Sequence, residues 1–171
     1  MQNVEFKAEL RDLALARSIC RVIGAEHIET LEQVDTYFNA ADARFKRRDT
    51  AGRPAQYILY HRKDRVAPKV SRYEILSEQQ AAARFGRVTP PPAVVVKKKR
   101  DVYLIDCVRI HLDRVEDLGD FLEFEALVSP KRTLRRCHES VRRLREQFAP
   151  ALGEPVSCGY ADLLIAAEKP G

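Results

Sequence analysis

The chain contains no tryptophan, only one methionine among its 171 residues, and no long uninterrupted apolar run. A membrane-spanning helix needs about 20 consecutive apolar residues, so the sequence predicts none and no membrane partner. The first ten residues, MQNVEFKAEL, also lack the apolar stretch of a secretory signal peptide. We therefore expect the protein to be cytoplasmic.

Cysteine is scarce, and the spacing of the cysteines matches no zinc site or CxxC redox motif. Cys20, Cys107, Cys137 and Cys158 form no CxxC pair and show no spacing typical of a zinc site. We expect free thiols in a reducing compartment. The sequence also lacks P-loop, GxGxxG, GxSxG and Cys-His arrangements, which argues against the common nucleotide-binding and acyl-transfer folds.

Apolar residues are abundant enough to build a core, and basic residues slightly outnumber acidic ones. The hydrophobic share is 45%, and 30 Lys and Arg against 25 Asp and Glu give a net charge of +5. No repeat or long linker divides the chain, so we expect a single domain over residues 1–171. The small positive surplus is a weak indication of an anionic partner.

Alternating apolar and polar residues predict strands, and apolar residues at helical spacing predict helices. The expected strands cover residues 3–10, 36–48, 55–63, 69–76, 93–104, 107–115 and 120–128. The expected helices cover residues 11–24, 77–85, 129–148 and 160–167. Asp12 is a candidate N-cap, SEQQ from Ser77 is a capping-box pattern, and Pro130 suits a first helical turn. This order of elements is typical of a sheet-rich α+β domain.

Several expected strands carry one largely apolar face and one almost purely ionic face. The ionic sets are Glu5 and Lys7; Arg44, Lys46 and Arg48; Lys97 and Lys99; Arg109, His111 and Asp113; and Glu123 and Glu125. A one-sided antiparallel sheet with its charges in water explains any single strand. Five such strands together favour a closed sheet with an ionic lumen. A dry lumen crowded with cations is costly, so we expect it to hold a polyanion, with carboxylates binding Mg²⁺ or Mn²⁺.

Several stretches resemble the CYTH superfamily, the triphosphate tunnel metalloenzymes, and within it the class IV adenylyl cyclase branch. They are NVEFK at 3–7, QVDTYF at 33–38 followed by RFKRR at 44–48, KVSRY at 69–73 and RIHLDRVEDLGDFLEFE at 109–125, with GYADLL at 159–164 similar to the family's C-terminal signature. The resemblance implies an α+β fold. In it, an eight-stranded antiparallel β-barrel forms a tunnel with a charged interior, and helices cover its apolar outer face.

The resemblance also implies roles for individual residues. The metal-binding carboxylates would be Glu5, Glu123 and Glu125. The residues that bind the triphosphate would be Arg44, Lys46, Arg62, Lys69, Lys97, Lys99 and Arg109. Asp113 would lie near the metal or the reacting end. Asn3 stands where the family motif has its first glutamate, so one acidic ligand is missing.

The expected catalytic residues are Lys7 and Asp113. Lys7, which we expect to lie among other cations, is a candidate proton acceptor. His111 is the alternative acceptor, although alternation alone places it inside the barrel, and a structural role explains it equally well.

The leading functional hypothesis is a Mg²⁺- or Mn²⁺-dependent conversion of ATP to cyclic AMP and pyrophosphate. Hydrolysis of inorganic or nucleoside triphosphate is an alternative, because it needs the same lining. A non-catalytic nucleotide or polyphosphate binder is another, and Asn3 is the residue that favours it.

A nucleic-acid-binding module is the weaker alternative. It rests on the net charge and on the arginines of residues 129–148, namely Arg132, Arg135, Arg136, Arg142, Arg143 and Arg145. Glu139 and Glu146 interleave with them and no aromatic residues accompany them, which is typical of a solvated helix face. The sequence leaves a monomer and a homodimer equally open.

Overall fold

The computed structural model describes residues 1–38, 44–62, 64–86 and 92–168, except for the side chains of residues 62 and 92. The strands are β1 (Gln2–Leu10), β2 (Glu26–Phe38), β3 (Arg44–Thr50), β4 (Gln56–Arg62), β5 (Lys69–Ser77), β6 (Pro92–Ile105), β7 (Val108–Val115), β8 (Gly119–Leu127) and β9 (Leu152–Pro155). The helices are α1 (Leu13–Val22), α2 (Glu78–Phe85), α3 (Leu134–Phe148) and α4 (Tyr160–Glu168), with a short 3₁₀ turn at Ala149–Ala151.

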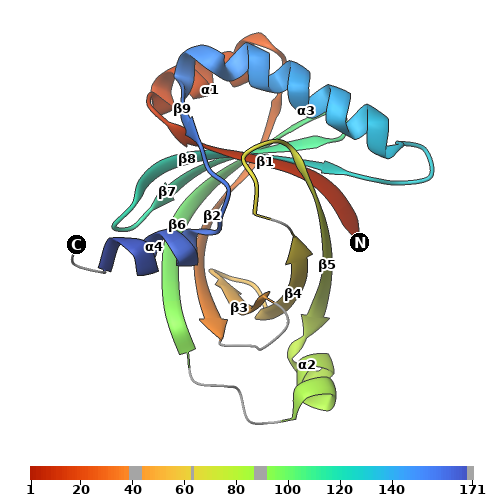
Figure 1. Ribbon diagram of the computed structural model, residues 1–171, viewed down its shortest axis with the longest axis vertical. Coiled ribbons are helices and arrows are strands. Elements are labelled where there is room, and N and C mark those ends of the chain that lie inside the picture. Colours follow the sequence, from red (N-terminus) through yellow and green to blue (C-terminus); the bar gives the residue numbers. More distant parts are fainter. Residues whose placement is uncertain (39–43, 63, 87–91, 169–171) are drawn as a thin grey trace.

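Eight of the described strands close into an antiparallel barrel. The order is β5-β4-β3-β2-β6-β7-β8-β1, and pairing of β1 with β5 completes the ring, with Glu5 opposite Lys69. The short strand β9 pairs with β1 as an additional strand. Figure 1 shows the ring of strands, with α1 and α3 packed on one side of it. The expected α+β tunnel fold is confirmed.

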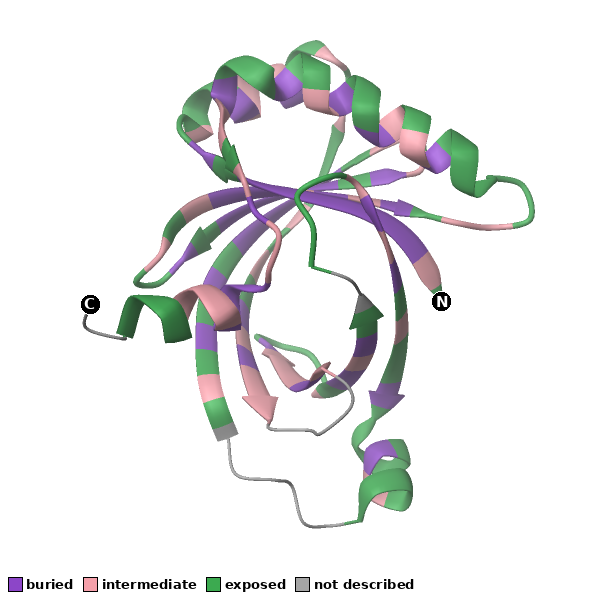
Figure 2. Cartoon of the chain, viewed as in Figure 1, coloured by how far each residue is buried: buried purple, intermediate pink, exposed green. Residues whose placement is uncertain are grey.

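The main hydrophobic core lies between this pair of helices and the outer faces of β1, β7 and β8. Phe6 and Phe124 stack at 6.1 Å between ring centroids, and Phe124 meets Phe148 of α3 edge-on at 5.4 Å. Val141 of α3 is wholly buried in the same cluster. Figure 2 shows buried residues concentrated on these strands and on the inward side of α3. Burial of this apolar face fixes which side chains of β1, β7 and β8 point into the barrel.

Smaller clusters attach the other two helices. α2 covers the outer face of β3 and β4, where Ala81 packs with Phe45 and Tyr57. α4 packs at one end of the tunnel, where Tyr160 contacts Phe121, with 5.1 Å between the ring centroids. Among the described residues, no helix is long and apolar enough to cross a membrane.

Local sequence signals located some element boundaries and missed others. Asp12 accepts a hydrogen bond from the Leu15 N–H at 2.8 Å, and Ser77 and Gln80 form a reciprocal capping box, both as expected. The expected helix over 129–148 is present as α3, but its expected start is wrong, because Thr133 caps α3 and Ser129 forms a β-bridge with Arg132.

The expected single strand at residues 36–48 is also wrong. It spans the end of β2 and the start of β3, which pair antiparallel so that Asp35 faces Arg48. The sequence NAADA at 39–43 interrupts the alternation of residue types, and the expectation of one strand did not take account of that interruption. Residues 26–35 of β2 and the whole of β9 were not expected as strands.

Candidate active site

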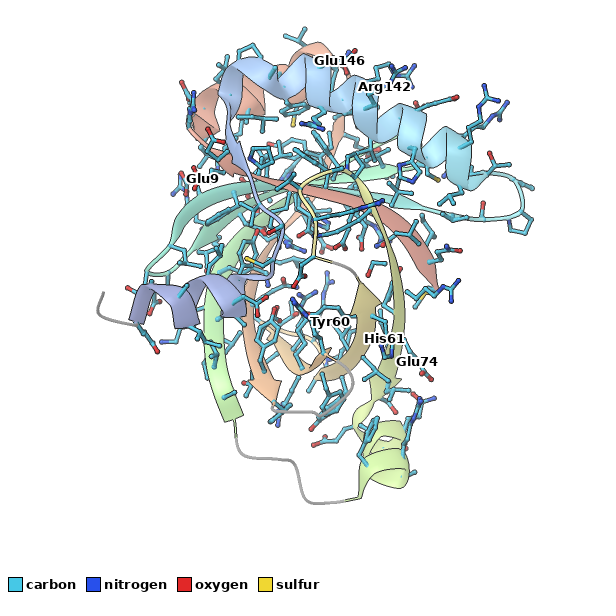
Figure 3. All side chains as sticks on the ribbon, viewed as in Figure 1. Glu9, Tyr60, His61, Glu74, Arg142 and Glu146 are labelled. Atoms are coloured by element: carbon cyan, nitrogen blue, oxygen red, sulfur yellow. The ribbon has the colours of Figure 1, made fainter. Side chains whose placement is uncertain are left out.

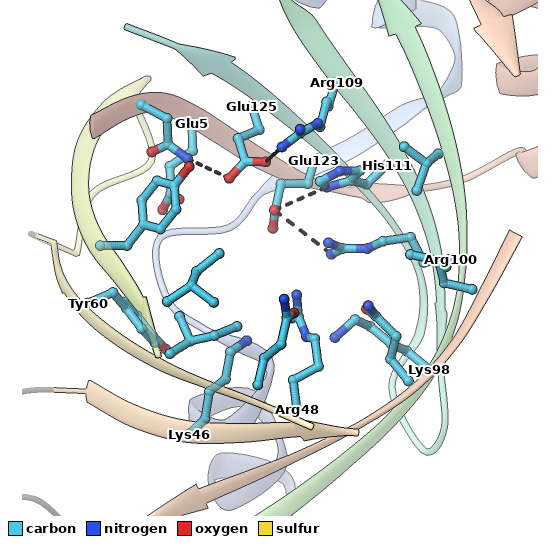
Figure 4. A pocket seen from close by; sticks show the side chains of 18 of the residues that line it. Glu5, Lys46, Arg48, Tyr60, Lys98, Arg100, Arg109, His111, Glu123 and Glu125 are labelled. Atoms are coloured by element: carbon cyan, nitrogen blue, oxygen red, sulfur yellow. Dashed lines mark hydrogen bonds and ion pairs between the residues drawn. The ribbon is translucent and has the colours of Figure 1, made fainter. Parts of the chain in front are cut away.

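The barrel encloses a cavity of about 540 Å³, a size typical of small-molecule sites. Its charged side chains form two opposed walls (Figure 4). The acidic wall consists of Glu5 from β1 and of Glu123 and Glu125 from β8. The basic wall consists of Lys46 and Arg48 from β3 and of Lys98 and Arg100 from β6. A polyanion inside the barrel would therefore meet cations on one side and, on the other, carboxylates that are accompanied by Lys7 and Arg109.

Glu123 is the most heavily engaged member of the acidic wall. Its Oε2 lies 3.3 Å from Lys7 Nζ, and its Oε1 lies 3.4 Å from His111 Nδ1 and 3.8 Å from Arg100 Nη2. Burial alone would raise the pKa of Glu123, but Lys7, His111 and Arg100 together hold that pKa well below its usual range. Glu123 is therefore ionised at neutral pH and can serve as an anionic ligand.

Glu125 and Asn3 form a second donor group on the same wall. Asn3 Nδ2 donates to Glu125 Oε1 at 2.5 Å, and Arg109 Nη1 lies 3.8 Å from Glu125 Oε2. The side-chain oxygen of Asn3 is buried and has no hydrogen-bond partner within the described part of the chain. An unsatisfied buried acceptor beside a carboxylate is costly, and a cation or its hydration water would satisfy it.

The acidic wall fits a hard divalent cation in its donor chemistry. Carboxylate and amide oxygens are ligands that Mg²⁺ and Mn²⁺ prefer. No cluster of three His, Cys, Asp or Glu side chains in the described ranges is close enough to hold a metal by itself. Mg²⁺ commonly combines one or two carboxylates with waters and substrate phosphates. The wall therefore fits a metal that is bound together with a phosphorylated substrate.

Burial is the main reason that the lysines in the basic wall have lowered pKa values. Burial and the neighbouring Arg48 lower the pKa of Lys46 well below its usual range. Burial also lowers the pKa of Lys98 to about 8, although Asp35 opposes that shift. The charge of this wall therefore changes near physiological pH.

Asp113 holds the Arg100 guanidinium in a fixed orientation. Arg100 Nε and Nη2 donate to the two carboxylate oxygens of Asp113 at 2.6 and 2.7 Å, and the Tyr160 hydroxyl donates to Asp113 Oδ2 at 2.6 Å. Burial would raise the pKa of Asp113, but the Arg100 guanidinium lowers it. Asp113 is wholly buried and does not line the cavity.

One part of the cavity lining is apolar. Its members are Ile28, Leu31, Ile58, Ile75, Val102 and Leu104. Ile28, Ile75 and Leu104 are exposed although they line the cavity, with 46%, 39% and 37% of their surface accessible. Single exposed apolar residues are ordinary. Here Ile58 and Ile75 face each other on β4 and β5, whereas the other four residues come from β2 and β6. All six line the same cavity as the charged walls, so a flat apolar group attached to a polyanion can pack against them.

Some of the expected site residues line the cavity and others do not. Those whose side chains line the cavity are Glu5, Lys7, Lys46, Arg109, Glu123 and Glu125. Arg44 instead pairs with Asp162 and Asp64, each at 2.7 Å. Lys69 donates to the Ser157 carbonyl at 2.5 Å and does not line the cavity. The Arg62 side chain lies outside the described residues.

The expectation that Lys97 and Lys99 face the tunnel is wrong. Lys97 points outward, with its side chain 58% exposed and paired with Glu116 at 3.6 Å, and Lys99 is exposed as well. Lys98 and Arg100 face the cavity instead. The run KKKR places cations on both faces of β6, so alternation within it cannot assign the faces. Pairing settles the question, because Arg100 lies directly opposite Asp113 of β7.

The expectations for Lys7 and Asp113 also change in detail. The Lys7 amine contacts the Glu123 carboxylate and lies 3.9 Å from the centroid of the Tyr160 ring, whereas we expected cations around it. Asp113 lies behind Arg100 and not at the cavity surface. Among the lysines that line the cavity, Lys46 and Lys98 have pKa values lowered by burial and by neighbouring cations.

The basic surface of α3 lies away from the cavity. Figure 3 shows Arg142 and Glu146 on the outer side of α3, whereas Tyr60 lies within the ring of strands and His61, the next residue, points outward. Arg135 and Glu139 pair within α3 at 2.9 Å. This arrangement is that of a solvated helix face.

The fold and the two walls define a class of protein, a closed antiparallel β-tunnel whose cavity is lined by charged side chains of both signs. The chain belongs to the CYTH domain family, whose sequence model matches residues 1–151. A candidate adenylate cyclase from Methanocaldococcus jannaschii is 27% identical over 141 residues, which cover 75% of this chain and 79% of that protein.

Solved structures share the fold. The PH1012 protein of Pyrococcus horikoshii superposes with a TM-score of 0.76 at 20% identity, covering 94% of this chain and 98% of that one. A candidate adenylate cyclase from Vibrio parahaemolyticus superposes with a TM-score of 0.73 at 18% identity, covering 95% of this chain and 97% of that one. A candidate adenylyl cyclase from Hippeastrum is described as having a dominant triphosphatase activity. It superposes with a TM-score of 0.57 at 17% identity, covering 99% of this chain and 97% of that one.

Proposed function

We propose that this protein is a divalent-metal-dependent enzyme that converts ATP to cyclic AMP and pyrophosphate inside the β-tunnel. The observation that carries the proposal is the charge lining of one cavity, in which three carboxylates face Lys46, Arg48 and Lys98, with Arg100 close to Glu123. A triphosphate resists attack by another oxygen nucleophile because of its negative charge. Fixed cations and a metal ion relieve that repulsion by electrostatic stabilisation.

The acidic wall would hold the metal. Glu5, Glu123 and Glu125 supply the charged ligands, and the unsatisfied oxygen of Asn3 supplies a neutral one. Mg²⁺ or Mn²⁺ bound there would neutralise phosphate charge and polarise the phosphorus–oxygen bonds. Asn3 in place of a glutamate reduces the negative charge of the wall, which favours one tightly held ion.

The remaining residues bind and orient the substrate. Arg48, Lys98 and Arg100 would contact the phosphate oxygens, with Arg100 held in a fixed orientation by Asp113. The apolar lining around Ile28, Ile75 and Leu104 would receive the adenine ring. This apolar region is what favours a nucleoside triphosphate over inorganic triphosphate.

Lys46 is the residue we assign to proton transfer. Burial and the neighbouring Arg48 lower its pKa, which makes this amine a better proton acceptor than an ordinary lysine. In the cyclase reaction the ribose 3′-hydroxyl gives its proton to Lys46 Nζ as its oxygen bonds to the α-phosphorus. The bond from the α-phosphorus to the bridging oxygen breaks, and pyrophosphate leaves with that oxygen.

Hydrolysis of a triphosphate is the second candidate function. It uses the same walls, with water giving its proton to Lys46 as its oxygen attacks the terminal phosphorus, and orthophosphate leaving. The structural relative from Hippeastrum, described as having a dominant triphosphatase activity, favours this reading. Non-catalytic binding is the remaining alternative.

Product analysis separates these functions. The protein would be incubated with ATP or inorganic triphosphate and Mg²⁺ or Mn²⁺, and the products resolved by chromatography. Cyclic AMP with pyrophosphate supports the cyclase, and orthophosphate supports the triphosphatase. Tight binding without turnover under either metal would contradict both. The Glu123→Gln variant serves as the control for contaminating phosphatases, because it should lose any turnover that belongs to this site.

A further inference from the structure

The carboxylate of Asp35 lies behind the basic wall and bonds to three of its cations. Lys46 Nζ and Lys98 Nζ donate to Asp35 Oδ2 at 2.8 and 2.7 Å. Arg48 donates through Nε to Oδ1 at 2.7 Å and through Nη2 to Oδ2 at 2.8 Å. Three of these four bonds end on Oδ2 and one on Oδ1, so both oxygens of the carboxylate are hydrogen-bonded. Asp35 is wholly buried and does not line the cavity, so it is placed to act on its partners and not on a ligand.

These contacts tie three adjacent strands together. Asp35 of β2 faces Arg48 of β3 directly, while Lys98 of β6 faces Gln33, two residues earlier on β2. A single side chain therefore sets the positions of cations that belong to both neighbours of β2. The spacing of charges along the basic wall depends on this shared anchor.

The group is also unbalanced in charge. Three cations share one carboxylate, which leaves a surplus of two positive charges in a buried position. Buried like charges repel strongly, because the interior screens them poorly. Without the carboxylate the surplus would be larger, and the side chains would separate or lose protons.

We infer that Asp35 is the positioning residue of the basic wall. It holds its three partner cations at the spacing in which they meet a polyphosphate, and it keeps them there while the tunnel is empty. The inference rests on the proposed function only in naming a polyphosphate as the ligand.

The titration behaviour of the lysines agrees with this role. Burial lowers the pKa of Lys98 to about 8, and Asp35 is the largest influence opposing the shift. Asp35 likewise opposes the lowering of the Lys46 pKa by burial and by Arg48. The charged and titratable groups around the cluster are Tyr37 of β2, Lys46 and Arg48 of β3, Tyr60 of β4, Lys98 and Arg100 of β6, Asp113 of β7 and Tyr160 of α4.

The first test is calorimetric titration of the full chain with inorganic triphosphate in the absence of divalent metal. Asp35→Asn should weaken binding on the order of 10–100-fold at pH 8.5, and the loss should be smaller at pH 6.5. The variant should also take up more protons per bound triphosphate, measured in buffers of different ionisation enthalpy. The reason is that a lysine without its counter-ion is less protonated in the empty tunnel, and the polyanion restores its proton. An equal loss at both pH values with unchanged proton uptake would overturn the inference.

A second variant covers the case in which Asp35→Asn folds poorly. Combining Asp35→Asn with Lys98→Met removes one charge of each sign. Because the single variant leaves buried cations uncompensated, the double variant should have the higher thermal midpoint, measured without ligand. A midpoint equal to or below that of the single variant would overturn the inference.

The outer face of β3 provides a matched control. Asp49 pairs there with Arg47 at 2.8 Å, with both side chains well exposed, so Asp49→Asn should change neither triphosphate affinity nor thermal midpoint. If the unmodified protein binds no triphosphate at all, the proposed function fails, while the stability comparison still decides the role of Asp35.

Discussion

Neighbouring lysines on β6 have opposite surroundings, because successive side chains of a strand point to opposite faces. Lys98 has 1% of its side chain exposed and contacts Asp35, whereas Lys97 is 58% exposed. Lys98→Ala should weaken binding of inorganic triphosphate on the order of 10–100-fold, because it removes a buried charged contact. Lys97→Ala should change it less than about twofold. Calorimetric titration of both variants checks this. A loss of affinity for Lys98→Ala as small as that for Lys97→Ala would place Lys98 outside the binding site.

The carboxylates of the acidic wall should differ from Asn3 in their importance for turnover. Glu123→Ala or Glu125→Ala should reduce metal-dependent kcat/KM by at least about 100-fold, because each removes a charged ligand. Asn3→Ala removes only a neutral oxygen and should have a smaller effect. Steady-state assays over a range of Mn²⁺ concentrations measure this. If all three variants behaved alike, the assignment of the ligands would be wrong.

At the residue scale, the sequence predicted the inward faces of β1, β7 and β8 but not that of β6. On β8, Glu123 and Glu125 alternate with Leu122 and Phe124, so the apolar residues show which face packs on the core and which faces the cavity. On β6 no such contrast exists within residues 97–100, and only the pairing with β7 assigns the faces. The network around Asp35 was missed because the separate strands β2 and β3, whose pairing brings Lys46 and Arg48 to Asp35, were expected as one strand, and because Lys98 is 63 residues away.

At the scale of elements, α3 is the helix that seals the barrel wall behind the acidic residues. Phe148 is wholly buried against Phe124 of β8. Phe148→Ala should lower the free energy of unfolding by about 3–5 kcal/mol, because it leaves a cavity in the main core. Arg143→Ala, on the exposed side of the same helix, should change it by no more than about 0.5 kcal/mol. Equilibrium urea unfolding measures both, and similar values would mean that α3 is not part of the core.

Capping signals predicted helix starts better than periodicity predicted strand ends. Asp12 and Ser77 act locally, and their hydrogen bonds fix the first turns of α1 and α2. Between β2 and β3 the sequence NAADA at 39–43 interrupts the alternation but contains no glycine or proline, so it is a weaker signal than a capping residue. The start of α3 was misplaced since Pro130 suits a first helical turn, while Thr133 supplies the actual cap.

At the scale of the whole molecule, the buried carboxylates couple stability to pH. The pKa of Asp113 is lowered in the folded state, because Arg100 outweighs the effect of burial. Its contribution to stability is therefore present above its unfolded pKa of about 3.9 and is lost as pH falls through the lower folded pKa. Asp113→Asn should reduce stability at pH 7 more than at pH 3. Urea unfolding of both proteins at pH 3–7 without ligand measures this, and a pH-independent difference would contradict it.

The central claim is that a nucleoside triphosphate binds between the two walls with its base in the apolar part of the cavity. The most direct measurement is a crystal structure with Mn²⁺ and an ATP analogue whose α–β bridging oxygen is replaced by methylene. We predict phosphates between Glu123 and Lys98, with the adenine ring against Ile28, Ile75 and Leu104. An analogue bound instead on the arginines of α3, or with its phosphates in the apolar region, would contradict the account.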